Sequence, residues 1–320
     1  DGGGDRRGER KGEGTQAVTN ITQRVALKPV TTSPTPTPGA SPTTTPSASS
    51  IVIAAVGDMH CTTSDCQGVG IDTMIAQIGP AAFFPDGDQV FSNTASNFNK
   101  FYDPSFGQFK SISHPAIGNY DGLTVYYDYW NGAGNSTGRA GPRNKGWYSF
   151  SKGSWQFVVL NSNCISGNTS QVSCQPGSEQ INWLQSDLAS HSNKCTIAFM
   201  HIPYYTSGSR QFPALQAIFQ TLYDHHVDVL ITGHIHDYQR FYPQDGSGNQ
   251  VADGVTEFVV GTGGGTLASA GNTPTAPNEA VLIGHAFGVL KMNLLSGSYN
   301  YQFLPAPGSS GSDSGSGTCH

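Results

Sequence analysis

Short apolar runs, each of the length of a buried β-strand, constrain the fold of this chain most. The runs that we expect to form strands cover 51–56, 81–84, 155–161, 195–200, 227–232, 256–261, 288–295 and 298–304. Two segments between them, 180–189 and 212–226, have the apolar spacing of amphipathic helices. Strands that alternate with helices predict an α/β domain with buried sheets.

Polar side chains that can bind metal ions follow several of these runs. Strand ends on one edge of a sheet lie close together, so scattered segments can meet at one site. Two carboxylates, one amide oxygen and four imidazoles suit Mn²⁺, Zn²⁺ or Fe better than Mg²⁺ or Ca²⁺. Seven donors are too many for one tetrahedral ion, but they fit two ions that share a carboxylate and act in displacement at phosphorus. The seven are Asp58, His60, Asp88, Asn119, His201, His234 and His236.

The composition narrows the class of protein. Charged residues make up 12% of the chain and the formal net charge is −6, so we expect no nucleic-acid partner. No apolar run approaches the roughly 18–20 residues that cross a bilayer, which predicts no membrane span. The six cysteines favour disulfides and an oxidising compartment, hence a secreted or cell-surface protein. Fifteen connectivities are open; local pairing would join Cys61 to Cys66 and Cys164 to Cys174, and leave Cys195 with Cys319.

The chain divides into three parts by composition. Residues 1–50 are expected to be disordered, and their last 20 residues form a Thr/Pro/Ser-rich stalk. Residues 51–305 contain all the strand and helix patterns and are expected to be the catalytic domain. Residues 306–320, rich in Gly and Ser, are expected to be a flexible tail.

The order of the motifs resembles the calcineurin-like metallophosphoesterase superfamily. The motifs are Asp58-Met59-His60, Gly87-Asp88, Gly118-Asn119, a lone His201, and Gly233-His234-Ile235-His236. Further similarity at 146–150, 157–164 and 233–264 points to the secreted branch related to purple acid phosphatases. The resemblance covers nearly all of 51–304, and it implies a sandwich of two mixed β-sheets flanked by helices.

The resemblance also implies roles for the site residues. Asp58, His60 and His236 would bind one metal ion, and Asn119, His201 and His234 the other, with Asp88 bridging the two. A hydroxide shared by the ions would attack phosphorus, since metal binding lowers the pKa of water towards about 7. The expected catalytic residues are Asn119, Tyr120 and Asp121.

Two departures from the family pattern concern three positions: Phe91 together with His60, and Tyr120. Phe91 stands three residues after Asp88, where purple acid phosphatases have a Tyr that binds Fe³⁺ and gives the colour. His60 is a donor which that branch usually lacks, so the number of ligands is kept and we expect a divalent, colourless site. Tyr120 replaces the family's His that protonates the leaving oxygen, and a phenol has an ordinary pKa of about 10. We therefore expect weak activity on esters with poor leaving groups.

Several alternatives stay open at this stage. The expected activity is hydrolysis of small phosphate monoesters, but a phosphodiesterase, or a catalytically weak surface-displayed module, would fit many of the same residues. The pattern favours a structural ion pair for Arg240 over substrate binding. Aromatic residues that follow Asn119 and His201 either pack inside loops or form a platform that stacks on the substrate; they are Tyr126, Tyr127, Tyr129, Trp130, Tyr204 and Tyr205. The metal identity and the oligomeric state are not set by the sequence.

Overall fold

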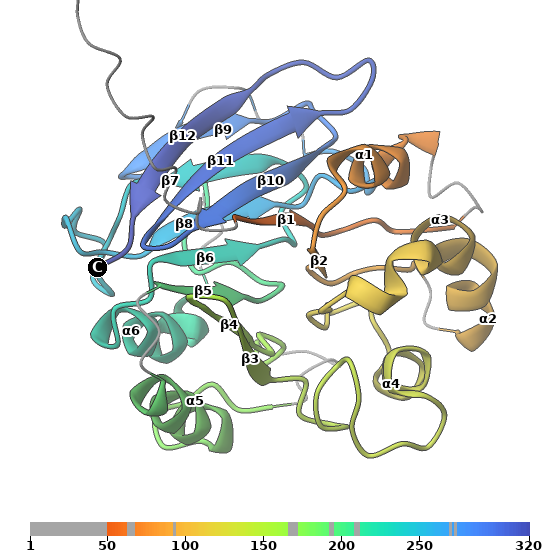
Figure 1. Cartoon of the computed structure of the whole chain (residues 1–320), viewed down its shortest axis with the longest axis horizontal. Helices are drawn as coiled ribbons and strands as arrows, with labels where there is room; N and C mark the ends of the chain where they lie inside the picture. Colours follow the sequence, from red (N-terminus) through yellow and green to blue (C-terminus); the bar gives the residue numbers. More distant parts are fainter. Residues whose placement is uncertain are drawn as a thin grey trace, which may run out of the picture. The chain divides into compact units, whose positions relative to one another are not determined.

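Two β-sheets stacked face to face form the centre of the structure, a computed structural model (Figure 1). It describes residues 50–62, 68–91, 94–165, 172–191, 195–207, 212–268, 271 and 274–320. The segment expected to be disordered therefore lies outside the described residues, except for Ser50.

The smaller sheet has five strands in the order β12-β11-β10-β1-β2. Only β1 and β2 run parallel, and the other neighbours are antiparallel. Its strands are β1 (Ile51–Val56), β2 (Ala82–Pro85), β10 (Gly288–Leu295), β11 (Ser298–Pro305) and β12 (Asp313–Thr318).

The larger sheet has seven strands in the order β3-β4-β5-β6-β8-β7-β9. Its centre, β4-β5-β6-β8, is parallel, while β3, β7 and β9 add antiparallel edges. The strands are β3 (Tyr148–Lys152), β4 (Trp155–Val159), β5 (Cys195–Phe199), β6 (Val229–Thr232), β7 (Tyr238–Phe241), β8 (Thr256–Val260) and β9 (Glu279–Ile283).

The hydrophobic core lies on both faces of the larger sheet, because alternate strand residues point to opposite sides. In β5, Ile197 and Phe199 pack in the interior shared with the smaller sheet. Ala198, between them, packs with the helices α5 (Glu179–Ser190) and α6 (Gln216–Asp224), which cover the outer face. The predicted fold class, α/β with two mixed sheets flanked by helices, is confirmed.

Further helices follow the strands of the smaller sheet, except for η4, which follows β5 of the larger sheet. Their many aromatic residues form buried packing rather than a surface. Tyr126 and Tyr127 of α4 are fully buried, and Tyr129 and Trp130 are nearly so. For these four residues the packing interpretation is therefore confirmed. The helices are α1 (Ile71–Ile78), α2 (Ala95–Asn97), η2 (Phe98–Tyr102), α3 (Asp103–Phe106), η3 (Gly107–Ile112), α4 (Leu123–Asn131) and η4 (Pro213–Leu215).

The Gly/Ser-rich tail contradicts the prediction of a flexible segment over 306–320, because it contains strand β12. This strand pairs with β11 so that Gly315 faces Tyr301 and Gly317 faces Tyr299. The tyrosine rings occupy the space that a β-carbon at either glycine would need. The edge strand β12 thus fits beside the tyrosines of β11 because it has glycine at the two positions that the rings cover. Only a strand rich in glycine fits there.

Two disulfides link described residues of this fold. Cys164 is bonded to Cys174 and Cys195 to Cys319, as local pairing predicts. The third expected pair involves Cys66, which lies outside the described residues. Within the described part of the chain, no helix has the length and apolar character needed to cross a membrane.

Candidate metal centre

The candidate metal centre lies where β1, β2, β5 and β6 end. Asp58 and His60 follow β1, Asp88 follows β2, His201 follows β5, and His234 follows β6. Because β1 runs parallel to β2 and β5 to β6, each pair ends at the same edge of its sheet. The order of the strands thus brings together residues that are far apart in the sequence. A 2.6 Å hydrogen bond, for example, joins His234 N to Asp58 Oδ2, which is 176 positions away.

Backbone strain marks the same loops. Among the described residues, seven residues other than glycine have positive φ, and four of them are Asp58, His60, Asp88 and His234. Residues other than glycine rarely adopt this backbone conformation. It costs about 1–3 kcal/mol at each position and persists where the surrounding structure imposes it, often at functional sites.

One group of side chains consists of Asp58, His60 and His236. One possible ligand atom of each lies within 4.8 Å of the others. Asp58 Oδ1 is 3.3 Å from His236 Nε2 and 3.9 Å from His60 Nε2. The two imidazole rings meet edge to face, with centroids 4.8 Å apart. Asp58 is fully buried and its Oδ1 makes no hydrogen bond to the described residues, so this oxygen remains available to a cation.

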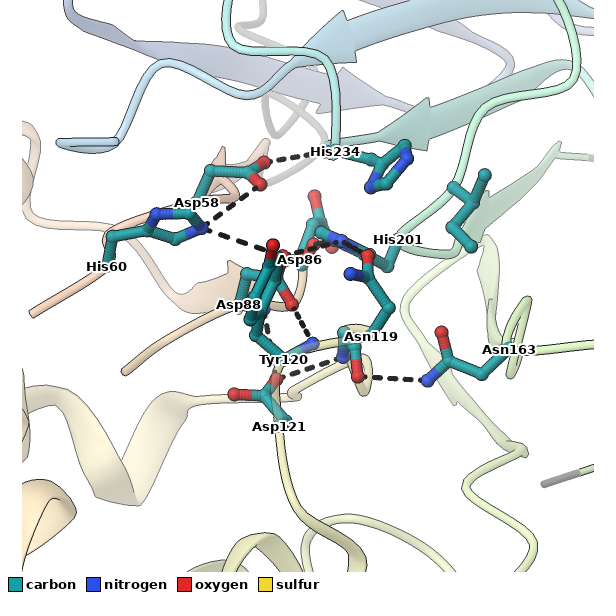
Figure 2. A network of polar contacts seen from close by, with 12 residues as sticks. Asp58, His60, Asp86, Asp88, Asn119, Tyr120, Asp121, Asn163, His201 and His234 are labelled. Atoms are coloured by element: carbon teal, nitrogen blue, oxygen red, sulfur yellow. Dashed lines mark hydrogen bonds and ion pairs between the residues drawn. The ribbon is translucent and has the colours of Figure 1, made fainter. Parts of the chain in front are cut away.

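A second group consists of Asp88, His201 and His234, again with possible ligand atoms within 4.8 Å of one another. Asn119 belongs with them, because its Oδ1 lies 3.0 Å from His201 Nε2. Asp88 Oδ2 lies 3.2 Å from the same nitrogen and 3.6 Å from His60 Nε2 of the first group. Asp88 therefore stands between the two groups (Figure 2).

Backbone carbonyls fix the orientation of two imidazoles. His201 Nδ1 donates a hydrogen bond to Asp86 O at 2.8 Å, and His236 Nδ1 donates one to Thr266 O at 2.6 Å. In each ring this leaves Nε2 directed at the carboxylates. Histidines that bind metals are commonly held in this way by a hydrogen bond at the other nitrogen.

The charges of the groups depend on one another. Burial raises the pKa of Asp88, but the charge of His201 and hydrogen bonds from His201 and His60 outweigh it, so the pKa lies below its usual range. Burial lowers the pKa of His201, but Asp88 and Asp58 outweigh it and raise the pKa to about 10. Burial, helped by the charge of His201, lowers the pKa of His234 to about 4. Burial also lowers the pKa of His236, but Asp58 outweighs it and the net shift is upward. The negative carboxylates thus attract positive charge to this site.

Two glycines allow the loops to approach each other. Gly87 has φ of 87°, and a β-carbon there would collide with the ring of His201. A β-carbon at Gly118 would collide with the carboxylate of Asp88. The glycines before Asp88 and Asn119 are therefore needed for the close packing of the candidate ligands.

The three residues predicted to be catalytic take different places. Asn119 faces His201, as described. Tyr120 has 47% of its side chain exposed, and its backbone N donates a 2.7 Å hydrogen bond to Asp88 Oδ1. Asp121 is buried and accepts hydrogen bonds from the backbone N of Asp88, Gln89 and Gly118. These bonds connect the loops of Asp88 and Asn119, and the catalytic role of Asp121 stays a prediction. Burial and the charge of Asp88 raise the pKa of Asp121 to about 7.

Sequence reasoning missed three buried residues around the site. Asp86 is fully buried with neither carboxylate oxygen hydrogen-bonded to the described residues, and burial raises its pKa. Asn163 Nδ2 donates to Gly118 O at 2.9 Å and so supports the loop of Asn119. Glu257 accepts hydrogen bonds from the backbone N of Tyr204 and Tyr205, which fixes the chain after His201. Burial raises the pKa of Glu257 to about 8. Asn163 and Glu257 lie within segments that carry the family resemblance, and Asp86 precedes the Gly87-Asp88 motif, but only the tertiary structure reveals what these side chains contact.

Arg240 does not belong to the site. Its guanidinium forms two hydrogen bonds, of 2.7 and 3.2 Å, with the carboxylate of Asp313 in β12. Tyr238 OH donates to the same carboxylate at 2.8 Å. The predicted structural ion pair is confirmed, and its acidic partner lies in the segment that was expected to be flexible.

The donor set fits divalent metal ions. With Nδ1 of His201 donating to a carbonyl, Nε2 faces Asn119 Oδ1 and Asp88 Oδ2, both acceptors. Such a convergence of lone pairs is unfavourable unless a cation or a proton lies among them. Mixed imidazole, carboxylate and amide donors are typical of Zn²⁺, Mn²⁺ and Fe sites. Each of the two groups could therefore hold one ion.

Comparison with known protein families identifies the family of this chain. Residues 51–238 match the family described as Calcineurin-like phosphoesterase. The chain belongs to this family. The predicted resemblance is confirmed, and the family implies a centre of two metal ions. The match includes the residues of both groups, from Asp58 to His236.

The relatives and neighbours include purple acid phosphatases. The chain is 36% identical over 76 residues to probable purple acid phosphatase 20 of Arabidopsis thaliana, a match that covers 21% of this chain and 18% of the relative. It is 28% identical over 202 residues to an uncharacterized protein of Mycobacterium tuberculosis, covering 55% of this chain and 38% of the relative. The structure resembles purple acid phosphatase PPD1 from yellow lupin seeds with a TM-score of 0.62 and 19% identity, covering 85% of this chain and 54% of that one. That likeness shows the fold, and the chain matches only a part of each relative.

Proposed function

We propose that this chain is a metal-dependent hydrolase of phosphate esters, and that its main substrates are small phosphate monoesters. The observation that carries the proposal is the position of Asp88, whose carboxylate lies within 3.6 Å of imidazoles from both candidate ligand groups. A carboxylate in this position can be shared by two cations and offset their mutual repulsion.

The proposed ligands divide as the two groups do. Asp58, His60 and His236 hold one ion, and Asn119, His201 and His234 hold the other, with Asp88 common to both. Two such ions supply a hydroxide nucleophile near neutral pH and stabilise the charge that develops during in-line displacement at phosphorus.

The protein's own residues keep this arrangement rigid. Asp121 fixes the loops of Asp88 and Asn119 through three backbone hydrogen bonds. The carbonyls of Asp86 and Thr266 hold two imidazoles in the orientation that directs Nε2 to the site. Tyr120, next to the shared carboxylate, is the proposed donor to the leaving oxygen.

Phe91 bears on the choice of metal. Its side chain has no oxygen, and its ring lies 5.7 Å from that of His60. We expect the iron-loaded protein to be colourless, because no phenolate is available at this position. An intense visible absorption band of the iron-loaded protein would contradict this expectation.

We also propose an extracytoplasmic location. The two disulfides support it, because such bonds persist in oxidising compartments.

The deciding experiment combines elemental analysis with an ester panel. The purified protein is assayed on p-nitrophenyl phosphate and on its bis ester, with a chelator and with added Mn²⁺, Zn²⁺ or Fe²⁺. We expect about two transition-metal ions per chain, activity that the chelator abolishes, and faster turnover of the monoester. Faster turnover of the bis ester would identify a phosphodiesterase. A protein without transition metal, or one indifferent to the chelator, would refute the proposal.

A further inference from the structure

Exposed aromatic rings gather beside the candidate metal centre. Among the described residues the exposed large hydrophobic side chains are Phe91, Tyr120 and Tyr242, which are 43%, 47% and 45% exposed. The rings of Phe91 and Tyr120 stack with centroids 5.5 Å apart and an interplanar angle of 26°. Each also lies 5.7 Å from the ring of His60. Two of the three exposed rings thus form one surface against a proposed metal ligand.

The backbone of each of these two residues is anchored by a hydrogen bond. Asn97 Nδ2 donates a 3.0 Å hydrogen bond to Phe91 O, and Tyr120 N donates to Asp88 Oδ1. Neither ring is covered by the aromatic residues of α4, which are buried. Exposed rings that stack on each other from an anchored backbone offer a contact surface that needs little ordering on binding.

A cavity of about 460 Å³ adjoins Phe91. His60 and Phe91 line it together with Val69 and Phe287, and Thr266 supplies polar atoms. Its volume falls in the range of about 300–1,000 Å³ that is usual for sites of small organic ligands. An ester whose phosphate lies at the imidazoles could therefore extend its organic part along Phe91 into this space.

The position of Phe91 indicates that its ring binds substrate and not metal. The resemblance places a metal-binding Tyr there, whereas the ring of Phe91 has no atom for a metal and is partly open to solvent. Aromatic faces bind other aromatic rings by offset stacking. The apolar ring thus offers a binding surface where the family pattern has a ligand.

We propose that Phe91 and Tyr120 form an aromatic platform that binds a planar aromatic group of the ester substrate. The inference rests on the proposed function for the position of the phosphate, and it adds the substrate class: phosphate esters that carry an aromatic ring. Phe91 supplies the stacking face towards the cavity, and Tyr120 holds that ring from behind.

The test measures binding without turnover. Phenylphosphonate and methylphosphonate are titrated by calorimetry into the wild-type protein and into Phe91→Ala, Phe91→Leu and Tyr242→Ala. Tyr242→Ala is the matched control, because it removes an equally exposed ring that is outside the proposed platform. We expect the wild type to prefer phenylphosphonate, and Phe91→Ala and Phe91→Leu to reduce that preference by about 2- to 10-fold. Tyr242→Ala should keep it.

The outcomes separate this inference from the proposed function. Equal binding of the two phosphonates, absence of binding, or an undiminished preference in Phe91→Ala would overturn the platform. Full preference in Phe91→Leu would also overturn it, since any apolar group would then suffice. If the ester panel shows no turnover while the preference depends on Phe91, the proposed function fails and the platform stands. Tighter, Phe91-dependent binding of adenosine 5′-phosphate would support the platform and identify its aromatic group as a nucleobase.

Discussion

The two ends of the larger sheet carry similar clusters of side chains and use them differently. At the ends of β5 and β6 lie the proposed metal ligands. At the starts of the same strands, Asp228 lies near Cys195, Cys319 and His320, and its group also has the spacing of a metal site. There, however, the two sulfur atoms are bonded to each other. Asp228 accepts hydrogen bonds from the backbone N of Thr196 and of His320.

The comparison shows that the types of residue in a cluster do not reveal its role. Around Asp228 the acceptors already have donors, so that end is structural. Around Asp58 and Asp88, acceptor atoms converge on one another, and one carboxylate oxygen has no hydrogen bond to the described residues. A cluster of donors becomes a candidate for metal binding when the protein leaves its lone pairs unsatisfied.

The largest effect expected from this comparison is on activity. Asp88→Asn removes the charge shared by the two groups, and should lower kcat/KM on p-nitrophenyl phosphate by about 10³-fold or more, since metal ions supply several kcal/mol of transition-state stabilisation. Asp228→Asn, the matched change at the other end, should keep turnover per folded molecule and lower stability by about 1–3 kcal/mol. Kinetics, metal content and thermal unfolding of both variants provide the check. Comparable losses of activity would break the distinction.

The disulfide between Cys195 and Cys319 should contribute more to stability than the one between Cys164 and Cys174. Cys195 and Cys319 are 124 residues apart, whereas Cys164 and Cys174 are 10 apart. Replacing the first pair with Ser should lower the free energy of unfolding by about 4 kcal/mol. The loss from replacing the second pair should be smaller by about 2 kcal/mol, because a shorter loop restricts the unfolded chain less. Urea denaturation measures both, and wild-type protein in a reducing agent gives the limit for the loss of all disulfides. A larger loss from the shorter loop would contradict this ranking.

A smaller effect is expected from Tyr120→His at the metal end. An imidazole titrates near neutral pH and can protonate a leaving oxygen better than a phenol. Turnover of an alkyl phosphate should rise about 10-fold or more, within the range of general acid catalysis, and that of an aryl phosphate should rise less. Parallel assays on glycerol phosphate and p-nitrophenyl phosphate provide the measurement. An equal change on both substrates would count against a role for Tyr120 in protonation.

The smallest effect concerns a histidine that belongs to neither cluster. His114 stacks on Phe150 with centroids 4.0 Å apart and on Phe84 at 5.5 Å. Burial, helped by the charges of Arg139 and Lys152, lowers its pKa from 6.5 to about 4. As the pH falls from 6.5 to 4, His114 therefore binds a proton in the unfolded chain before it does so in the folded protein. The free energy of unfolding decreases in that window.

The variant His114→Phe has no proton to take up, so its stability should fall less than that of the wild type between pH 7 and pH 5.5. The expected difference is about 1 kcal/mol, and thermal unfolding at the two pH values measures it. An identical fall in both proteins would show that His114 is solvated in the folded state. The result shows whether burial alone, outside either cluster, lowers the pKa of a histidine.

The sequence predicted the central strands and the order of the motifs well. The run at 51–56 is strand β1 with the same bounds, and the helix expected over 180–189 is α5 with one more residue at each end. Apolar runs of this length leave little choice, because the strands are buried on both faces. Strands β3, β7 and β9 carry mixed or partly exposed side chains, and their pattern gave no comparable signal.

The tail and the surroundings of the site could not be predicted. Residues 313–318 have no apolar pattern, and their strand depends on the rings of Tyr299 and Tyr301. The support from Asp121 and Asn163 consists of hydrogen bonds to backbone atoms of distant segments. Hydrogen bonds of this kind leave no periodicity or spacing in the sequence.

The sequence by itself determined the family, the buried strands and the kinds of side chain that stand at their ends. These follow from local hydrophobicity and from short motifs, which act over a few residues. The tertiary structure alone decided that Asp88 lies between two groups of imidazoles, that Asp228 is fully hydrogen-bonded, and that Phe91 remains exposed beside His60. Each depends on which strands are neighbours and how closely their loops approach. Long-range packing settles this, and no local segment encodes it.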